Sequence, residues 1–294
     1  MAGSRRELGS NTGVTRAGFI GLGSQGAGMA QRMIELRVPT TLWARRAESL
    51  KPFAGRAAVA ADRVELGRLS DVLGVCVTDG AAVRDVVLGP NGALSGMTPG
   101  SVLVLHSTIG TDDCAEIVAA ATAHGVEVID APVSGGGAMA AAGRLTVYVG
   151  GSDAAVACAR PVLETYGDPV LHMGAFGSGL RTKLVNNALA AAHFALAHEA
   201  FALGNALGLD PDQLANALRS GSGRSFSLEI FAGLRSFDAI AGHVGPIMSK
   251  DIGLFAHETQ GSATAPGVLL EAADRFLALL HHPRNVGADE PGGD

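Results

Sequence analysis

A glycine-rich loop between a strand pattern and a helix pattern constrains this chain more than any other feature. The apolar run ending in Phe19-Ile20 leads into Gly21-Leu22-Gly23-Ser24-Gln25-Gly26, and a helical pattern follows as far as Leu36. In such a turn the first glycine permits the tight bend, the second lets the backbone approach a pyrophosphate, and the third allows close helix–strand packing. The helix N-terminus attracts the negative charge. This context predicts a dinucleotide-binding site at Gly21–Gly26.

Strand and helix patterns alternate through the first half of the chain. The apolar strand patterns are Thr15–Gly21, Thr40–Ala44, Val72–Thr78, Ser101–Leu105, Val126–Asp130 and Leu145–Val149. The helical patterns between them are Gln25–Leu36, Ala81–Leu88, Asp112–His124 and Asp153–Tyr166. Short apolar strands that alternate with helices favour a mostly parallel sheet with helices on both faces. We therefore expect residues 14–176 to form an α/β Rossmann domain that binds NAD(P).

From Gly177 onward the chain has helical patterns only. A long one runs from Leu180 to Leu207, and a second begins at Asp210–Pro211, where Asp suits the cap and Pro the first turn. Further helices are expected at Phe226–Leu234, Lys250–Gln260 and Pro266–His281. We expect residues 177–282 to form an all-helical substrate and oligomerisation domain. The ends, residues 1–13 and 283–294, are polar and Gly-rich and are predicted to be disordered.

Composition excludes several classes of protein. The chain has 22 Lys and Arg against 28 Asp and Glu and no basic block, which disfavours nucleic-acid binding. No apolar run is long enough for a membrane helix, and the N-terminus lacks the apolar stretch of a signal peptide. Three scattered cysteines cannot form a disulfide framework, so we expect a cytoplasmic protein. Aromatic residues make up only 4%, which predicts a core of Ala, Val and Leu.

The end of the second predicted strand bears on the choice of dinucleotide. An acidic residue there would hold a ribose 2′-hydroxyl, whereas arginine accommodates a 2′-phosphate. The sequence reads Leu42-Trp43-Ala44-Arg45-Arg46, without Asp or Glu. Arg45 and Arg46 could clamp a phosphate bidentately, although they could equally begin a solvated helix. The pair favours NADP over NAD.

A second glycine motif follows the strand that ends at Asp130. It reads Ala131-Pro132-Val133-Ser134-Gly135-Gly136-Gly137. Successive backbone N–H groups exposed by glycines form a concave set of donors that suits a carboxylate, and the Ser134 hydroxyl could add one more. We therefore predict a carboxylate site at Ser134, Gly135 and Gly136. The alternative is a flexible turn between a strand and a helix.

Lys183 and Asn187 are four residues apart near the start of the long helix and project from the same face. Their neighbours are apolar, so desolvation is expected to depress the pKa of Lys183 and let it exchange a proton near neutral pH. Asn187 offers a donor and an acceptor to a substrate hydroxyl. Taken alone, Lys183 could instead be a lysine whose stem packs on apolar surface while its amine reaches water.

Taken together and in order, these motifs resemble the β-hydroxyacid dehydrogenases, which include 3-hydroxyisobutyrate dehydrogenase, tartronate semialdehyde reductase and glyoxylate/succinic semialdehyde reductases. The resemblance rests on Gly21–Gly26, on Asp130–Gly137 continuing to Gly150-Gly151, and on Gly177-x-Gly179-x-x-x-Lys183-x-x-Asn186-Asn187. It runs from about Val14 to His281. It implies an NAD(P)-dependent oxidoreductase that interconverts a small β-hydroxyacid and its semialdehyde or oxo acid.

The resemblance also implies roles for single residues. Lys183 would be the general acid/base, Ser134, Gly135 and Gly136 would hold the substrate carboxylate, and Asn187 would fix the substrate beside the lysine. Four further positions match cofactor contacts of the family: Val77, Thr78, Thr108 and Lys250. The family often has Leu-Pro in place of Val77-Thr78, and an acidic or other polar residue in place of His106. The chemistry implies no metal.

Two alternative functions share these motifs. Imine reductases look similar in both domains and favour NADP, but they usually carry another residue in place of Lys183. A non-catalytic dinucleotide sensor would be expected to have lost that lysine. The long helix 180–207 is apolar around most of its circumference, so a second subunit could cover it. We expect a homodimer or homotetramer, in line with the family.

Overall fold

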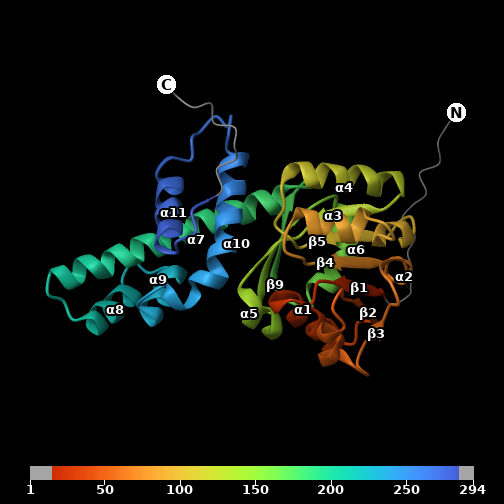
Figure 1. The fold of residues 1–294 in the computed structure, drawn as a ribbon, viewed down its shortest axis with the longest axis horizontal. Coiled ribbons are helices and arrows are strands. Elements are labelled where there is room, and N and C mark those ends of the chain that lie inside the picture. Colours follow the sequence, from red (N-terminus) through yellow and green to blue (C-terminus); the bar gives the residue numbers. More distant parts are fainter. Residues whose placement is uncertain (1–14, 285–294) are drawn as a thin grey trace. The chain divides into compact units, whose positions relative to one another are not determined.

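The computed structural model of this chain describes residues 15–284. The segment 1–13, predicted to be disordered, lies outside the described residues, as does residue 285 onward. Pro283 and Arg284 are described: the Pro283 carbonyl accepts a hydrogen bond from Ser249, and Arg284 pairs with Asp274. The chain forms two compact units, Met1–Lys183 and Leu184–Asp294 (Figure 1).

The first unit is built on a nine-stranded sheet with the order β3-β2-β1-β4-β5-β6-β8-β7, in which β9 also pairs with β8. The strands are β1 (Ala17–Ile20), β2 (Thr40–Trp43), β3 (Ala58–Val59), β4 (Val72–Val75), β5 (Val102–Leu105), β6 (Glu127–Asp130), β7 (Val133–Ser134), β8 (Leu145–Gly150) and β9 (Gly167–Gly174). The strands from β3 to β6 in this order are parallel, whereas β8 runs antiparallel to β6 and β7. The predicted mostly parallel sheet is confirmed.

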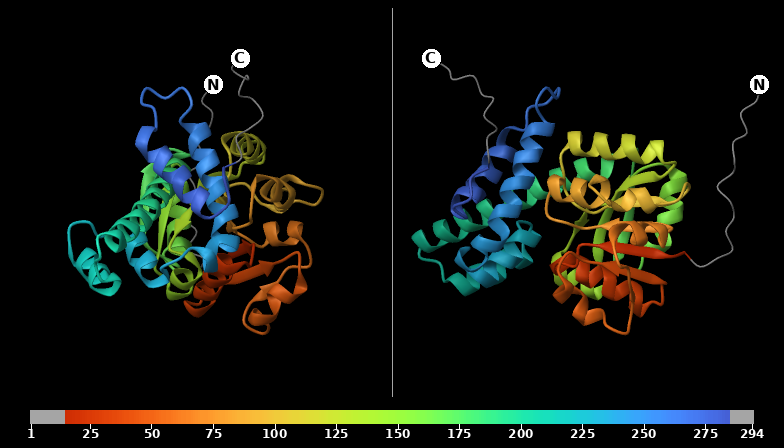
Figure 2. Two further views of the ribbon diagram at one scale, coloured as in Figure 1. Left: turned by 60° about the vertical axis from the view of Figure 1, so that its left-hand side comes forward. Right: turned by 45° about the vertical axis from the view of Figure 1, so that its right-hand side comes forward.

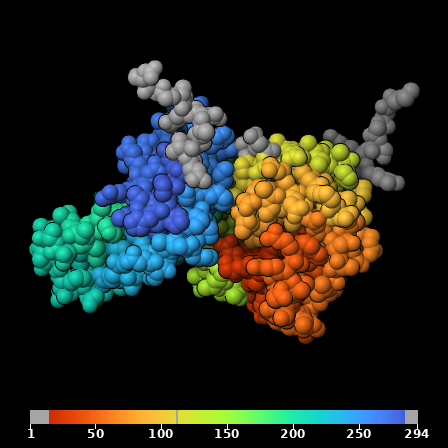
Figure 3. Space-filling view, viewed as in Figure 1, coloured from red at the N-terminus to blue at the C-terminus, as the bar shows by residue number. Residues whose placement is uncertain are grey.

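Helices cover both faces of this sheet (Figure 2). They are α1 (Ser24–Glu35), α2 (Arg63–Arg68), α3 (Gly80–Leu88), α4 (Thr111–Ala123), α5 (Gly136–Ala142) and α6 (Asp153–Leu163), with short 3-10 helices η1 (Ala47–Phe53) and η2 (Ala93–Gly96). Helices α3 and α4, gold and yellow, form much of the surface of this unit in the view of Figure 3.

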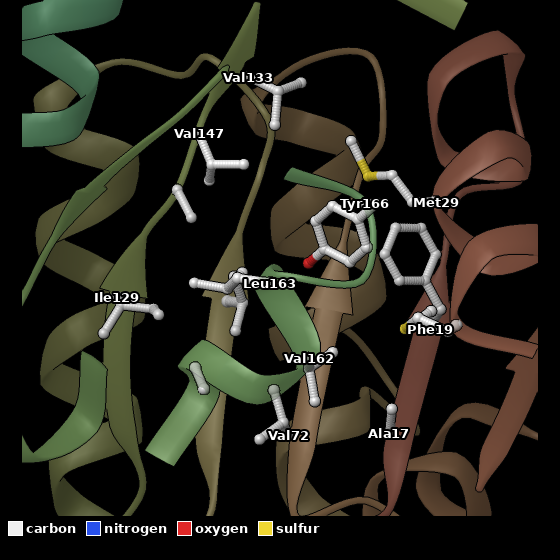
Figure 4. Packing of buried hydrophobic residues seen from close by; sticks show 14 of the residues in the cluster. Ala17, Phe19, Met29, Val72, Ile129, Val133, Val147, Val162, Leu163 and Tyr166 are labelled. Atoms are coloured by element: carbon white, nitrogen blue, oxygen red, sulfur yellow. The ribbon is translucent and has the colours of Figure 1, made fainter. Parts of the chain in front are cut away.

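Alternation along the strands creates two separate cores. Successive side chains of a strand point to opposite faces, so Phe19 joins the core under α1, α5 and α6, and Ile20 joins the core under α2, α3 and α4. Figure 4 shows the first core, where the ring of Tyr166 lies beside Phe19 and Met29. Because both faces are buried, the central strands are apolar throughout, which explains why their sequence patterns are easy to recognise.

The second unit is helical in all its described residues apart from short connections. Its helices are α8 (Pro211–Ser220), α9 (Phe226–Leu234), α10 (Asp238–Glu258) and α11 (Gly267–Leu279), together with most of α7 (Ser178–Ala206). Helix α10 begins at Asp238 rather than at the expected Lys250. The sequence pattern does not predict its first half as helical, because Gly242, Gly245 and Pro246 are residues that usually interrupt helices. None of the described helices has the length and apolar character needed to cross a membrane.

The core of the helical unit contains several aromatic rings besides the expected Ala and Leu. The rings of Phe194, Phe231, Phe237 and Phe276 pack on one another, with centroids 4.9 Å apart for Phe194–Phe276 and for Phe231–Phe237. Small alanines of α7, such as Ala188 and Ala191, bring the helices close around these rings. Four of the ten Phe residues of the chain therefore meet in one cluster, which total composition does not reveal.

Candidate functional site

The carboxyl ends of five neighbouring strands lie side by side in the first unit. Ile20 at the end of β1 pairs with Trp43 of β2 and with Val75 of β4. Leu105 of β5 pairs with Val75 and with Asp130 of β6. Because these strands are parallel, the segments that follow them leave the sheet at one edge, which is where open α/β sheets bind ligands. Apart from Lys183, the predicted site residues of this unit lie in the segments that follow these five strands.

Each glycine of the first motif has its own steric reason. Gly21 adopts a positive φ of 99°, and a Cβ atom there would lie 2.0 Å from the Cys76 carbonyl oxygen. A Cβ atom on Gly26 would lie 1.9 Å from the Gly21 carbonyl oxygen. Gly23 differs, because a Cβ atom there would have no neighbour within 4 Å. The backbone at Gly23 is therefore open to a ligand, whereas Gly21 and Gly26 shape the turn.

The amino end of α1 fits the pyrophosphate of a dinucleotide. Gly23 caps the helix without a side-chain hydrogen bond, and the first turn, which starts at Ser24 and Gln25, has no acidic residue. The first N–H groups of a helix lack partners within the helix and attract anions. Leu22 packs against the core beneath this loop.

Arg45 and Arg46 follow β2, and both are exposed. Neither guanidinium forms an ion pair with a residue between 15 and 284. Arg46 also directly precedes the 3-10 helix η1. The two alternatives drawn from the sequence, a solvated helix start and a pair of exposed cations, therefore apply to the same residues.

The loops after β4 and β5 are tied together. The Val77 N–H donates to Ser107 Oγ at 2.9 Å, and the Gly21 turn lies against the Val77 side chain. Thr78 is exposed and donates from Oγ1 to Asp79, which in turn caps α3. Thr108, which comes next after Ser107, is half-buried. The fold therefore brings Val77, Thr78 and Thr108 to the edge that carries the first glycine motif.

His106 lies in a buried series of hydrogen bonds for which the sequence predicts no role. Its Nδ1 donates to the Ala131 carbonyl at 2.7 Å, so its Nε2 accepts from the Tyr166 hydroxyl at 3.0 Å. Its ring also stacks on Phe19. Burial lowers the pKa of His106 to about 4, and the Ala131 carbonyl only partly offsets this. No sequence signal links positions 106 and 166, because they meet only in the folded core.

The second glycine motif forms a strand–helix junction. Ser134 ends β7, and positive φ values of 132° at Gly135 and 73° at Gly136, the first residue of α5, turn the chain into that helix. A hydrogen bond links the side chains of Ser134 and Tyr148, and burial raises the pKa of Tyr148. A Cβ atom on Gly137 would lie 2.8 Å from the Ser24 carbonyl oxygen, so α5 lies directly against the first motif.

Lys183 lies in the second turn of α7 and is half-buried. The start of this helix is attached to the end of β6: Asp130 accepts hydrogen bonds of 2.6 Å from the N–H groups of Gly177 and Leu180. Burial raises the pKa of Asp130, and these two N–H groups oppose the shift. Asn187 follows Lys183 by four residues, so the two side chains leave α7 on the same side.

In the helical unit, Asn187 and Lys250 share one buried carboxylate. Asn187 Nδ2 donates to Asp251 Oδ2 at 2.7 Å, and Lys250 Nζ donates to Asp251 Oδ1 at 2.8 Å. The Asp251 side chain is only 3% exposed. Sequence reasoning named Lys250 and Asn187 and gave Asp251 no role. The position of Asp251 directly after Lys250 is the one sequence signal that points to this carboxylate.

The edge of the Rossmann sheet and its glycine loop define a dinucleotide-binding protein. A family model described as the NAD binding domain of 6-phosphogluconate dehydrogenase matches residues 16–174. A second, described as NAD-binding of NADP-dependent 3-hydroxyisobutyrate dehydrogenase, matches residues 177–290.

Relatives and a solved structure agree with these models. Mitochondrial 3-hydroxyisobutyrate dehydrogenase of Mus musculus is 33% identical over 95% of this chain and 88% of its own length. The NAD-dependent L-serine dehydrogenase of Pseudomonas aeruginosa is 34% identical over 89% of this chain and 91% of its own. The structure of Mycobacterium tuberculosis 3-hydroxyisobutyrate dehydrogenase with L-serine matches with a TM-score of 0.78 and 27% identity, covering 91% of this chain and 98% of that one.

The chain belongs to the β-hydroxyacid dehydrogenase family, of the 3-hydroxyisobutyrate dehydrogenase type. It is an NAD(P)-dependent oxidoreductase acting on CH–OH groups, which confirms the class expected from the motifs.

An imine reductase from Pseudomonas sp. matches with a TM-score of 0.60 at 18% identity, a likeness that concerns the fold alone. Within the described part of the chain, no group of three or more His, Cys, Asp or Glu residues could hold a metal ion.

Proposed function

We propose that this chain interconverts a small β-hydroxyacid and the corresponding semialdehyde or oxo acid, with Lys183 as general acid/base. One observation carries the proposal: the turn before Lys183 is hydrogen-bonded to Asp130, and the segment that leads to Ser134 departs from the same residue. A proton-transfer group and a set of carboxylate donors therefore originate at one strand end.

The residues divide the chemistry between them. The Ser134 hydroxyl and the N–H groups of Gly135 and Gly136 bind the substrate carboxylate. In the oxidising direction, neutral Lys183 accepts the hydroxyl proton while Asn187 orients the hydroxyl oxygen. In the reducing direction, the Lys183 ammonium stabilises the developing charge on oxygen and protonates it. A nicotinamide dinucleotide, when bound, accepts or supplies the hydride.

The substrates named for relatives share one chemical pattern. L-Serine and 3-hydroxyisobutyrate both carry a carboxylate and a primary hydroxyl on the β carbon. A carboxylate held at Ser134–Gly136 leaves the hydroxyl two carbon atoms away as the reacting group. We propose these two acids as the first to test.

We propose NADP as the preferred dinucleotide. Arg45 and Arg46 are exposed cations at the carboxyl end of β2, without ion pairs to described residues, and a guanidinium binds phosphate oxygens bidentately. Val77, Thr78 and Thr108 complete the cofactor side of this edge, and we assign a cofactor contact to Lys250 as well.

We also propose that the chain is a homodimer or homotetramer. Leu189, Leu196 and Leu203 of α7 are 46%, 56% and 62% exposed, and their spacing of seven residues places them in one stripe. Such a stripe favours packing against another helix. Multi-angle light scattering should give at least twice the monomer mass, and Leu196→Glu should lower that mass. A monomeric wild-type protein would contradict this.

The test of the function begins with a substrate screen. NADP+ and NAD+ are assayed with 3-hydroxyisobutyrate and L-serine, and NADPH with a semialdehyde and a cyclic imine. The chain has only three lysines, which supplies a matched control. Lys183→Ala should lower kcat by about 10²- to 10⁴-fold and leave NADPH binding intact. Lys51→Ala, in the 3-10 helix η1, should change neither. Turnover of the imine alone, or full activity of Lys183→Ala, would refute the proposal.

A further inference from the structure

Asp130 is a buried carboxylate that the proposed chemistry does not use. It is fully buried at the end of β6, yet both of its oxygens are engaged outside that strand. We infer that Asp130 is a positioning residue for Lys183: it fixes the first turn of α7 relative to the Ser134–Gly136 segment. This inference rests on the proposed function.

The hydrogen bonds are those that a helix start requires. Asp130 Oδ1 accepts from the Gly177 N–H and Oδ2 from the Leu180 N–H, each at 2.6 Å. The first N–H groups of a helix have no partner within it. A carboxylate accepts hydrogen bonds from them, and its negative charge interacts favourably with the positive end of the helix dipole. Most caps come from the residue just before the helix. Here the acceptor is 47 residues away in sequence, so it joins two distant segments.

Two glycines leave the space that this carboxylate occupies. A Cβ atom on Gly150 would lie 2.3 Å from Asp130 Oδ1. A Cβ atom on Gly179 would lie 2.8 Å from Oδ2 and 2.4 Å from the Tyr148 carbonyl oxygen. A side chain at either position would displace the carboxylate or the helix. Glycine at these two positions therefore permits the close contact between the end of β6 and the start of α7, and a larger residue would not.

The contact is well placed to control distance. Lys183 follows Leu180 by three residues, about one helical turn, so holding the Leu180 N–H also fixes the part of α7 from which the Lys183 side chain leaves. On the other side, Ser134 follows Asp130 by four residues. The intervening segment is held by the bond from His106 to the Ala131 carbonyl and by the bond from the Tyr148 N–H to the Pro132 carbonyl. Asp130 thus sets the separation between the Lys183 amine and the carboxylate donors.

The primary test is Asp130→Asn, which keeps the size of the side chain. It turns one acceptor into an NH₂ group that faces a backbone N–H, so α7 must shift. Reacting groups misplaced by an ångström lose up to about a hundredfold in rate, so kcat should fall by about ten- to a hundredfold. The NADPH dissociation constant and KM should change little, because the glycine loop and Ser134 are untouched. An unchanged kcat in a folded Asp130→Asn variant would overturn the inference.

Asp71→Asn is the matched control. Asp71 also accepts from a backbone N–H, that of Arg16 at 2.8 Å, but at the opposite end of β1 and β4. A carboxylate with a purely structural role should affect stability without affecting kcat, and this is what we expect of Asp71→Asn. If the two variants lose kcat equally, Asp130 has no special positioning role.

A double-mutant cycle separates action through Lys183 from general disruption. In a Lys183→Ala background the lysine no longer needs to be positioned, so adding Asp130→Asn should change the residual rate by less than about twofold. The same loss in both backgrounds would overturn the inference and leave the proposed function intact. Full activity of Lys183→Ala alone would instead refute the proposed function.

Hydrogen exchange on the wild-type protein tests the contact without any variant. The Gly177 and Leu180 amides should be protected to the same degree as the amides of β6, because a buried carboxylate holds them. Fast exchange at both positions would overturn the inference even if Asp130→Asn failed to fold.

Discussion

Asn187 Nδ2 donates a 2.7 Å hydrogen bond to Asp251, and this bond fixes the direction of the Asn187 amide. The bond uses one of the two hydrogens of the Asn187 NH₂ group, so the second can donate to a substrate oxygen, and Asn187 Oδ1 accepts a 3.2 Å hydrogen bond from Asn186 Nδ2. The second oxygen of Asp251 holds Lys250. One buried carboxylate on α10 therefore orients two residues proposed to act on substrate and cofactor.

Removing this carboxylate should affect stability and activity together. Asp251→Ala leaves the buried Asn187 amide without its acceptor, which should cost about 1–3 kcal/mol of unfolding free energy. The freed amide should also lower kcat/KM. Denaturant unfolding and steady-state kinetics measure the two effects. Asp238→Ala, an exposed residue on the same helix, is the control and should change kcat/KM little. Wild-type values for Asp251→Ala would contradict the prediction.

Alanine substitutions in the first glycine motif should have two different effects, one on NADPH binding and the other on stability. Gly23→Ala adds a methyl group to open space, so the unfolding free energy should change by less than about 1 kcal/mol. The methyl group would occupy the approach of a pyrophosphate, so NADPH should bind more weakly. Gly26→Ala drives a Cβ atom against the Gly21 carbonyl and should cost about 1–3 kcal/mol or more.

Thermal unfolding without cofactor and fluorescence titration with NADPH distinguish these two outcomes. Gly233→Ala, in α9 with no neighbour within 4 Å, is the control for a harmless added methyl group. If Gly23→Ala bound NADPH as tightly as the wild-type protein, the pyrophosphate would not bind at this loop, and the prediction would be wrong.

Local patterns predicted the elements that are buried on both faces. Strands such as β1 and β5 are continuous apolar runs, and their ends are marked by glycine or polar residues. Strand β9 lacks such a pattern, because most of its side chains are exposed and Pro169 interrupts it. Strands β3 and β7 have two residues each, too few for any periodicity. These elements depend on their neighbours in the sheet, which the local sequence does not encode.

The candidate site shows the same division. Residues that act through the backbone, such as Gly21 and Gly26, are recognisable because the turn demands them locally. The sequence marks Asp130 only as the end of a strand before a glycine motif, since its partners Gly177 and Leu180 lie far along the chain. Hydrogen bonds between distant segments are a property of the tertiary fold. A single sequence therefore identifies the ligand-binding segments before it identifies what holds them in place.

The arginine pair should control the choice between the two dinucleotides. Replacing Arg45 and Arg46 together by Ala removes charge-assisted hydrogen bonds worth about 1.5–3 kcal/mol, so KM for NADP+ should rise by about ten- to a hundredfold. KM for NAD+ should change little, because NAD+ lacks the 2′-phosphate. Arg68→Ala, an exposed arginine of α2 paired with Glu65, is the control. An equal rise for both cofactors would contradict the assignment.

His106 makes the stability of the first unit depend on pH. Burial holds its pKa at about 4 in the folded chain, against an ordinary value of 6.5. Between these values the unfolded chain binds a proton that the folded chain does not. The unfolding free energy therefore falls as the pH drops from 6.5 towards 4, by about 3 kcal/mol in total.

Comparison with a variant that cannot titrate isolates this contribution. His106→Gln lacks the ionisable group, whereas all other histidines remain and contribute equally to both proteins. The wild-type advantage in unfolding free energy should be largest above pH 7 and should shrink by about 2 kcal/mol by pH 5. Urea unfolding at pH 7.5, 6 and 5 measures it. A difference that stays constant across this range would mean that burial does not keep the His106 ring neutral in the folded chain, and would contradict the prediction.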